Sequence, residues 1–113
     1  MNITAETYGR AVILYLKGEL TVDTLEAVRK SVAHHIEDEQ IVDVVFSMQE
    51  VPFVDSAGLE YLLELQDALA ERLGQVKFVR CDESIRKIFE VTRLDSDFEV
   101  MSDVADAVKT IQA

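Results

Sequence analysis

The feature that most constrains this chain is a strand pattern followed, across a proline, by a long amphipathic helix pattern. Residues 41–47 are β-branched and mostly apolar, which is typical of a central strand buried on both faces of a parallel sheet. Pro52 cannot continue a regular strand, so the strand must end before it. The helix that follows is expected to end at Leu73, with Gly74 as its C-cap. Its core-facing side is predicted to hold Leu59, Leu62, Leu63, Gln66, Leu69, Ala70 and Leu73.

Strand and helix patterns alternate along the rest of the chain. Gly9 and Arg10 form a tight turn between two short strands, which can pair as an antiparallel hairpin. Later strands are separated by helices, so they should pair in parallel through βαβ crossovers. Strands are predicted at residues 3–8, 11–17, 41–47, 75–80 and 98–101. Helices are predicted to begin at Thr21 or Asp23, at Asp55 or Ser56, at residues 82–84, and at Ser102 or Asp103.

The three shorter helices each have one apolar face. Their inward residues are expected to be Leu25, Val28, Val32 and Ile36 in the first, Ile85, Ile88 and Phe89 in the third, and Val104, Val108 and Ile111 in the last. Together the patterns predict an α/β fold in a single domain spanning residues 1–113, long enough to bury a core. The sheet is expected to be mixed and mostly parallel, with about four to five strands and about four α-helices.

Composition and charge exclude several classes of function. The formal charge of -11, from 22 acids and 11 bases, disfavours non-specific binding to nucleic acid or anionic membranes and favours a basic partner surface. Membrane insertion is not expected, because no apolar run approaches membrane-spanning length. An N-terminus without signal-peptide features and a single cysteine, Cys81, predict a cytoplasmic location. A solvated acidic stripe is predicted on the long helix at Glu60, Glu64, Asp67 and Glu71.

The sequence offers little catalytic chemistry. Val54 occupies the first glycine position of a G-x-S-x-G elbow around Ser56, so a hydrolase is not supported. His34 and His35 are neighbours on a helix and therefore do not share a face for a metal ion. No phosphate-binding glycine loop occurs, and Cys81 is expected to be a packed small residue. We therefore expect no enzymatic activity, no cofactor and no metal.

Ser56 stands where the long helix begins. Unpaired backbone N–H groups and the helix dipole would stabilise a phosphate placed on its hydroxyl. The alternative is that Ser56 or Asp55 serves only as an N-cap. Gly58 leaves the first turn without a Cβ that could shield it from a partner. Alternatively, Gly58 is needed for a positive φ or for close packing beneath the helix.

Three segments carry a resemblance to a known family. Residues 53–59, F-V-D-S-A-G-L, resemble the D-S-[SA]-G-[LV] signature of STAS domains, and in particular of bacterial anti-sigma-factor antagonists. Residues 18–20 resemble the G-E-L segment that ends an early strand of the family, and residues 85–94 resemble its late helix. Three positions depart from the family pattern: Thr21 replaces a frequent Asp, Ala57 a second Ser, and Arg93 a frequent Gly.

The resemblance implies a protein-binding switch. Ser56 would be the phosphoacceptor of a partner that is both an anti-sigma factor and a serine kinase and uses its own ATP. Unmodified protein would bind this partner and free its sigma factor. The implied partner surface comprises Glu19, Thr21, Asp23, Asp55, Ser56, Ala57, Gly58 and Leu59. The alternative is a constitutive scaffold, or an accessory subunit of a transporter or stress-signalling complex, in which Ser56 is only a cap.

Overall fold

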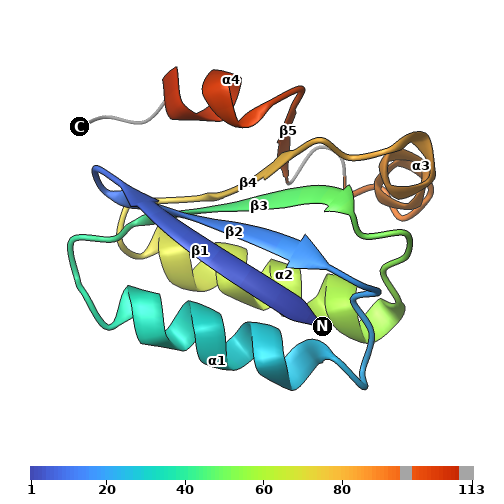
Figure 1. Ribbon diagram of the computed structural model, residues 1–113, viewed down its shortest axis with the longest axis horizontal. Coiled ribbons are helices and arrows are strands. Elements are labelled where there is room, and N and C mark those ends of the chain that lie inside the picture. The colour runs from blue at the N-terminus through green and yellow to red at the C-terminus, as the bar shows by residue number, and fades with distance from the viewer. Residues whose placement is uncertain (95–97, 110–113) are drawn as a thin grey trace.

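A hairpin followed by alternating helices and strands makes up the chain, as the sequence patterns predict (Figure 1). The computed structural model describes residues 1–94 and 98–109. The strands are β1 (Asn2–Tyr8), β2 (Ala11–Lys17), β3 (Asp43–Glu50), β4 (Val76–Val79) and β5 (Glu99–Met101). The helices are α1 (Leu25–Ile36), α2 (Ser56–Ala70), α3 (Glu83–Val91) and α4 (Val104–Lys109). Among the described residues, no helix combines the length and apolarity needed to cross a membrane.

The five strands form one sheet in the order β1-β2-β3-β4-β5. β1 is antiparallel to β2, and every other neighbouring pair is parallel, so the predicted mixed, mostly parallel sheet is confirmed. The hairpin closes through the pair Tyr8 and Ala11, and Gly9 in its turn has a positive φ of 56°. Glycine adopts this conformation without steric cost. β3 lies at the centre of the sheet and is buried on both faces.

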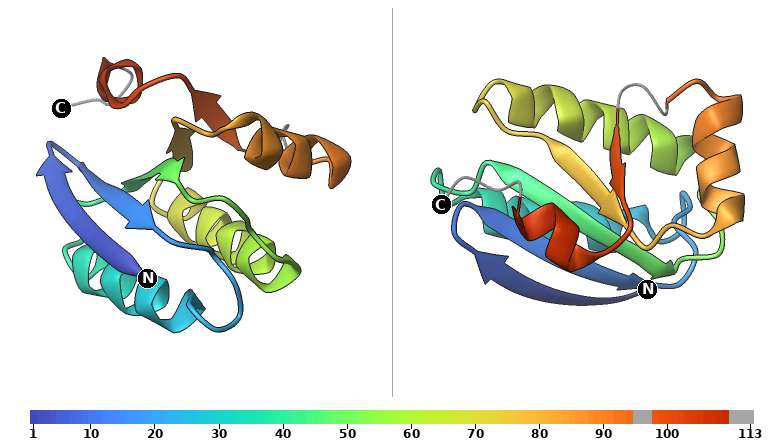
Figure 2. Two further views of the ribbon diagram at one scale, coloured as in Figure 1. Left: turned by 45° about the vertical axis from the view of Figure 1, so that its right-hand side comes forward. Right: turned by 90° about the horizontal axis from the view of Figure 1, so that it is seen from above.

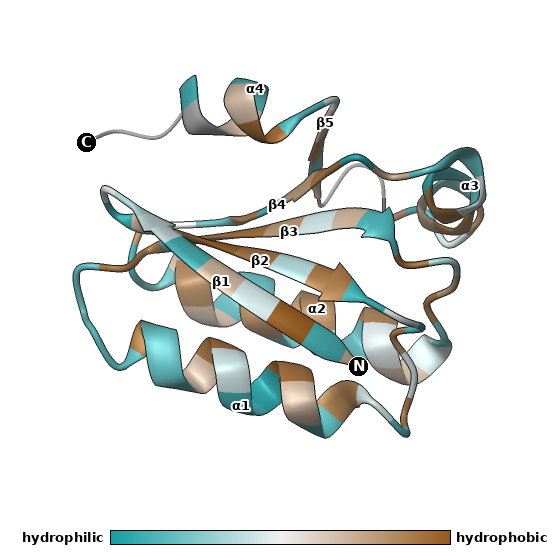
Figure 3. Cartoon of the chain, in the orientation of Figure 1, coloured by the Kyte–Doolittle hydropathy of each residue, from teal (hydrophilic) through white to brown (hydrophobic). Residues whose placement is uncertain are grey.

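Helices cover the sheet unequally (Figures 1 and 2). α1 and α2 lie side by side on one face, α4 lies on the other, and α3 sits beyond the end of the strands. The larger core cluster fills the α1–α2 side, where Phe78 contacts the rings of Phe46, Phe89 and Phe98 at centroid distances of 5.0–5.7 Å. A smaller cluster beneath α4 includes Ile13, Val45, Val79 and Ala107. Hydrophobic residues follow the strands between these layers (Figure 3).

The apolar face of α2 differs in part from the prediction. Leu62 and Leu69 are buried as expected, but Tyr61 and Leu65 are also buried and were not predicted. The helix ends at Ala70, so Ala70 is exposed and Leu73 is 96% exposed. The buried face of α2 is therefore rotated relative to the predicted one, and the prediction extended the helix about one turn past its end.

The C-terminal end of α2 uses its glycine for a different purpose from the one expected. Leu73, not Gly74, has the positive φ, at 62°. Gly74 donates its N–H to the Leu69 carbonyl at 2.9 Å, and a Cβ at Gly74 would collide with the carbonyl of Val42. The glycine is thus required by close packing against the segment that enters β3.

Two further boundaries, those of α1 and β3, differ from the prediction for non-local or side-chain reasons. α1 is capped by neither Thr21 nor Asp23. Its N-cap is Thr24, whose side chain makes no cap bond to the helix and instead donates to the Glu19 carbonyl at 2.7 Å. β3 begins only at Asp43, because the Val42 N–H donates at 2.8 Å to the Arg10 carbonyl in the hairpin turn. It continues past residue 47 to Glu50, which pairs with Lys17 of β2.

The remaining helix faces follow the prediction. Leu25, Val28 and Val32 are buried in α1, and Ile85 and Phe89 are buried in α3. Asp82 caps α3 by accepting the Ile85 N–H at 2.9 Å. At the start of α4, Asp103 accepts the Val104 N–H at 2.7 Å. Of the predicted inward residues of the last helix, the side chain of Val108 and the whole of Ile111 lie outside the described residues.

Candidate functional site

Two loops meet at the carboxyl end of the sheet, beside the start of α2. Leu20, after β2, donates its N–H to the Phe53 carbonyl at 2.9 Å, and the Asp55 N–H donates to the Leu20 carbonyl at 3.1 Å. Leu20 and Val54 also form an isolated parallel bridge. We call this set of contacts, together with the Asp55 carboxylate, the loop junction. It brings the loop carrying Glu19 next to the loop carrying Ser56.

Asp55 holds the loop junction with both of its carboxylate oxygens. One oxygen accepts the Gly58 N–H at 2.9 Å and so caps α2. The other accepts the Val22 N–H at 3.0 Å, across 33 residues of sequence. A single carboxylate therefore caps the N-terminus of α2 and also holds the neighbouring loop. Of the two predicted caps, Asp55 is the one that the structure uses.

Within the described chain, the Ser56 side chain makes no hydrogen bond that holds the helix or the loop. Its side chain is exposed at the first position of α2, and its hydroxyl makes no hydrogen bond with residues 1–94 or 98–109. The backbone N–H groups of Ser56 and Ala57 are likewise unpaired within that part of the chain. Helix N-terminal donors of this kind favour an anion. The nearby acids in sequence, Asp55 and Glu60, oppose that preference.

Gly58 does not present an open surface, and its role as a partner contact stays a prediction. The residue is buried, and a Cβ built on it would lie 2.9 Å from both the Leu20 carbonyl oxygen and Val54 Cγ1. Its φ is not positive. These contacts support the second interpretation of this glycine, in which it allows α2 to pack closely on the loop junction.

The structure brings most of the other predicted site residues to the same end of the sheet. Glu19 and Asp23 are exposed, whereas Thr21, Ala57 and Leu59 are half-buried. The sequence analysis missed Val22 and Phe53, which are 67% and 46% exposed on the two loops. The motif comparison quoted Phe53 within residues 53–59 but assigned it no contact, and it did not include Val22. Local sequence does not show that either side chain is exposed.

Three other side chains have reactive groups: Cys81, His34 and His35. Cys81 is buried, and burial raises the pKa of its thiol to about 11, so the thiol is protonated at neutral pH. His34 is exposed and half-buried His35 places Nδ1 2.8 Å from the Ser31 carbonyl oxygen, both in the last turn of α1. Within the described ranges, no group of three or more His, Cys, Asp or Glu side chains could hold a metal ion.

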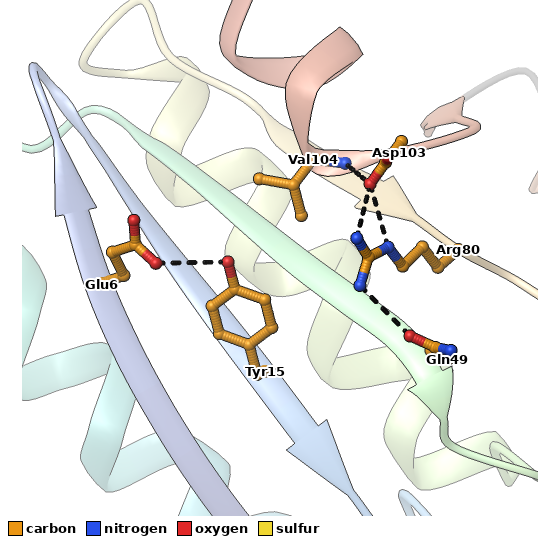
Figure 4. A network of polar contacts seen from close by, with 6 residues as sticks. All are labelled: Glu6, Tyr15, Gln49, Arg80, Asp103 and Val104. Atoms are coloured by element: carbon orange, nitrogen blue, oxygen red, sulfur yellow. Dashed lines mark hydrogen bonds and ion pairs between the residues drawn. The ribbon is translucent and has the colours of Figure 1, made fainter.

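A second polar network lies on the face of the sheet that α4 covers (Figure 4). Arg80, at the end of β4, has a positive φ of 55°. Its guanidinium donates to Asp103 Oδ1 from Nε at 2.9 Å and pairs with it from Nη2 at 2.8 Å, while Nη1 reaches Gln49 at 3.2 Å. These bonds hold the pKa of Asp103 below its ordinary value, with a contribution from the Val104 N–H. We call this set the α4 junction.

Known proteins share this architecture. An anti-sigma factor antagonist from Mycobacterium paratuberculosis superposes with a TM-score of 0.85 at 20% identity, covering 99% of this chain and 94% of that one. The Bacillus cell fate determinant SpoIIAA, an anti-sigma factor antagonist, is similar in its unphosphorylated form (TM-score 0.75, 21% identity, 97% and 100% coverage). Its phosphorylated form gives the same TM-score at 19% identity, with 98% and 100% coverage. At these identities the likeness shows the fold.

Sequence comparison agrees with the fold. The "Anti-sigma F factor antagonist" of Paenibacillus polymyxa is 20% identical over 112 residues, which are 99% of this chain and 96% of that protein. The family model described as the STAS domain matches residues 2–107, which include both loops of the junction, α2 and α3. The chain therefore belongs to the STAS domain family.

Proposed function

We propose that this protein is an anti-sigma-factor antagonist whose binding to its partner is switched by phosphorylation of Ser56. The observation that carries the proposal is the division of roles at the start of α2. Asp55 caps the helix and binds Val22, so the exposed Ser56 hydroxyl is free for chemistry. Relatives that bear the name of anti-sigma factor antagonist, and the existence of SpoIIAA in a phosphorylated form, support the same function.

The proposed partner is an anti-sigma factor with serine kinase activity. It would transfer the γ-phosphoryl group of its own ATP to Ser56 Oγ, with ADP as the leaving product. The partner must also supply the base that takes the hydroxyl proton, because both histidines lie at the far end of α1. The sigma factor would be released when unmodified protein binds the anti-sigma factor, a role in transcription that places the protein in the cytoplasm.

The phosphate would act on the interface and leave the fold intact. It adds about -1.5 to -2 charges at pH 7. The unpaired N–H groups of Ser56 and Ala57 can donate hydrogen bonds to the phosphate oxygens, so α2 should persist. An interface that fits the neutral hydroxyl would instead have to bury a dianion next to Asp55, and binding should be lost.

The test is capture of partners from a lysate of the native host on wild-type protein, Ser56→Ala and Ser56→Asp. Wild type and Ser56→Ala should retain an anti-sigma factor, and Ser56→Asp should not. The purified partner with ATP should then add one phosphate to wild type, located at Ser56 by mass spectrometry. Ser102→Asp is the matched control, since Ser102 is an exposed serine just before α4.

The outcome separates the proposed switch from the alternative. A partner that bound wild type and Ser56→Asp equally well, with no phosphate on Ser56, would reject the switch. Such a result would favour the constitutive scaffold or accessory subunit. Capture of membrane-transporter or stress-signalling components in place of an anti-sigma factor would reject the antagonist function itself.

A further inference from the structure

An apolar pocket lies next to the loop junction, between the loop that leads to Ser56 and helix α3. Its volume is about 330 Å³. The loop contributes Pro52 and Phe53, and α3 contributes its outer side. The principal lining residues are Pro52, Phe53, Lys87, Ile88, Val91 and Thr92.

The apolar walls of this pocket are unusually exposed for side chains of their type. Phe53 is 46% exposed and Val91 is 71% exposed, which makes them two of the five large hydrophobic residues on the surface of the described chain. Val22, on the other loop of the junction, is a third. Exposed apolar side chains that gather in one region mark interaction sites more often than scattered ones do. Here they lie on the two loops and the helix that surround the start of α2.

The backbone beneath the pocket is held in place. The Phe53 carbonyl accepts the Leu20 N–H at 2.9 Å, so the loop is fixed while its ring faces outward. On the other side, α3 is anchored by the buried residues Ile85 and Phe89, and by the Asp82 cap. A preformed pocket loses little conformational freedom when an apolar group enters it.

Lys87 gives the pocket a positive charge. Its side chain lines the pocket, and it makes no hydrogen bond or ion pair with any described residue. The acids Asp82 and Glu83 share a neighbouring hollow with it, but neither is paired to it. In a chain with a net charge of -11, an unpaired cation beside apolar walls suits a carboxylate from outside.

We infer that this pocket receives an apolar side chain, flanked by a carboxylate, from the same anti-sigma factor that contacts Ser56. The inference rests on the proposed function and names a second contact of that interface. The pocket supplies a place for an apolar anchor, and Lys87 pairs with the acidic neighbour. Because Phe53 stands three residues before Ser56 on the same fixed loop, one partner surface can reach both. Phosphorylation of Ser56 then switches binding, while the pocket contributes affinity that does not depend on phosphorylation.

The main experiment measures binding of the purified anti-sigma factor by titration calorimetry. Val91→Glu and Lys87→Glu should each weaken binding about tenfold, as truncated or mischarged interface anchors do. Leu73→Glu is the matched control for Val91→Glu, because Leu73 is 96% exposed and lies at the far end of α2. Lys30→Glu, on the exposed side of α1, is the control for Lys87→Glu. Thermal melts of all four variants check that the fold is retained.

A small-molecule probe tests the chemistry of the pocket without the partner. Sodium 4-phenylbutyrate carries one apolar ring and one carboxylate. In amide-resolved NMR it should shift the signals of Phe53, Lys87, Ile88 and Val91, and these shifts should be lost in Val91→Glu and Lys87→Glu. The absence of such shifts in wild type, or equal shifts in both variants, would overturn the stated ligand chemistry.

The possible failures can be told apart. Loss of partner binding in Ser56→Asp, with full binding by Val91→Glu and Lys87→Glu, would overturn this inference and leave the proposed function standing. A wild-type protein that binds no anti-sigma factor would overturn both. Dissociation of a homodimer by Val91→Glu would assign the pocket to a second copy of this chain and would also overturn the inference.

Discussion

The loop junction and the α4 junction both join separate segments at the carboxyl end of the sheet, but they are built from different groups. At the loop junction, backbone groups of Leu20, Phe53 and Asp55 bond directly to one another, and Gly58 packs against them. At the α4 junction, the half-exposed guanidinium of Arg80 bonds to the half-exposed carboxylate of Asp103. The first arrangement relies mainly on backbone hydrogen bonds and close packing, with the Asp55 carboxylate as its one charged side chain. The second relies on a charged pair of side chains.

At the loop junction, the backbone bonds that form the frame are separate from the side chains that the loops expose. Backbone hydrogen bonds do not depend on which side chains project from the loops. Ser56, Val22 and Phe53 can therefore face a partner while the frame beneath them stays unchanged. The α4 junction has no such separation, since the side chains that are exposed are the same ones that hold the helix.

The largest expected effect comes from filling the space at Gly58. Gly58→Leu should destabilise the fold by about 3 kcal/mol, because its side chain must displace the Leu20 carbonyl and Val54. Gly58→Ala should still cost about 1 kcal/mol, in spite of the better helix propensity of alanine. Urea unfolding measures both. The control is Ala68→Leu, an exposed position on the same helix, which should change stability by about 0.5 kcal/mol or less. A neutral Gly58→Leu would mean that the loop junction is not packed tightly.

The sequence predicted the arrangement of strands and helices well and the contacts at the junctions poorly, for a physical reason. Apolar β-branched runs such as that in β3 and helical spacing such as that in α1 are local signals. The role of Gly58, by contrast, depends on Leu20, and that of Gly74 depends on Val42, both distant in the chain. The second bond of Asp55 reaches Val22 across 33 residues. Contacts between distant residues leave no periodic pattern in the sequence. A glycine or a helix cap can therefore be recognised from the sequence, but the distant residue that it contacts cannot.

The next largest effect compares two helix caps of the same type. Asp55 and Asp82 each accept an N–H from the third residue of a helix, at 2.9 Å in both cases. Asp82→Ala should cost about 1 kcal/mol, the usual value for a lost N-cap. Asp55→Ala should cost about 2 kcal/mol, because the Val22 N–H also loses its partner. Equal losses in chemical denaturation would show that the second bond of Asp55 adds nothing to the loop junction.

Acid should loosen the α4 junction. The pKa of Asp103 lies below its ordinary value of 3.8 in the folded protein, chiefly because of the hydrogen bond from Arg80. A depressed pKa means that the contribution of Asp103 is fully present above that ordinary value and is lost as pH falls through the folded value. The Val104 N–H donates to Asp103 Oδ1 at 2.7 Å, so its chemical shift should change over this pH range in NMR spectra. Asp103→Asn should abolish this titration, and a titration that survived would trace the change to another carboxyl group.

The smallest expected effect concerns the residue with the largest proposed functional effect. Ser56 makes no hydrogen bond within the described chain, and Asp55 already caps α2. Ser56→Ala and Ser56→Asp should therefore each change the free energy of unfolding by about 0.5 kcal/mol or less. If Ser56 were instead the working cap, Ser56→Ala would cost about 1 kcal/mol. Denaturant unfolding of these variants beside Asp55→Ala decides between the two roles. If Ser56 can be changed without cost to the fold, any effect of its variants on partner binding can be assigned to the proposed charge switch.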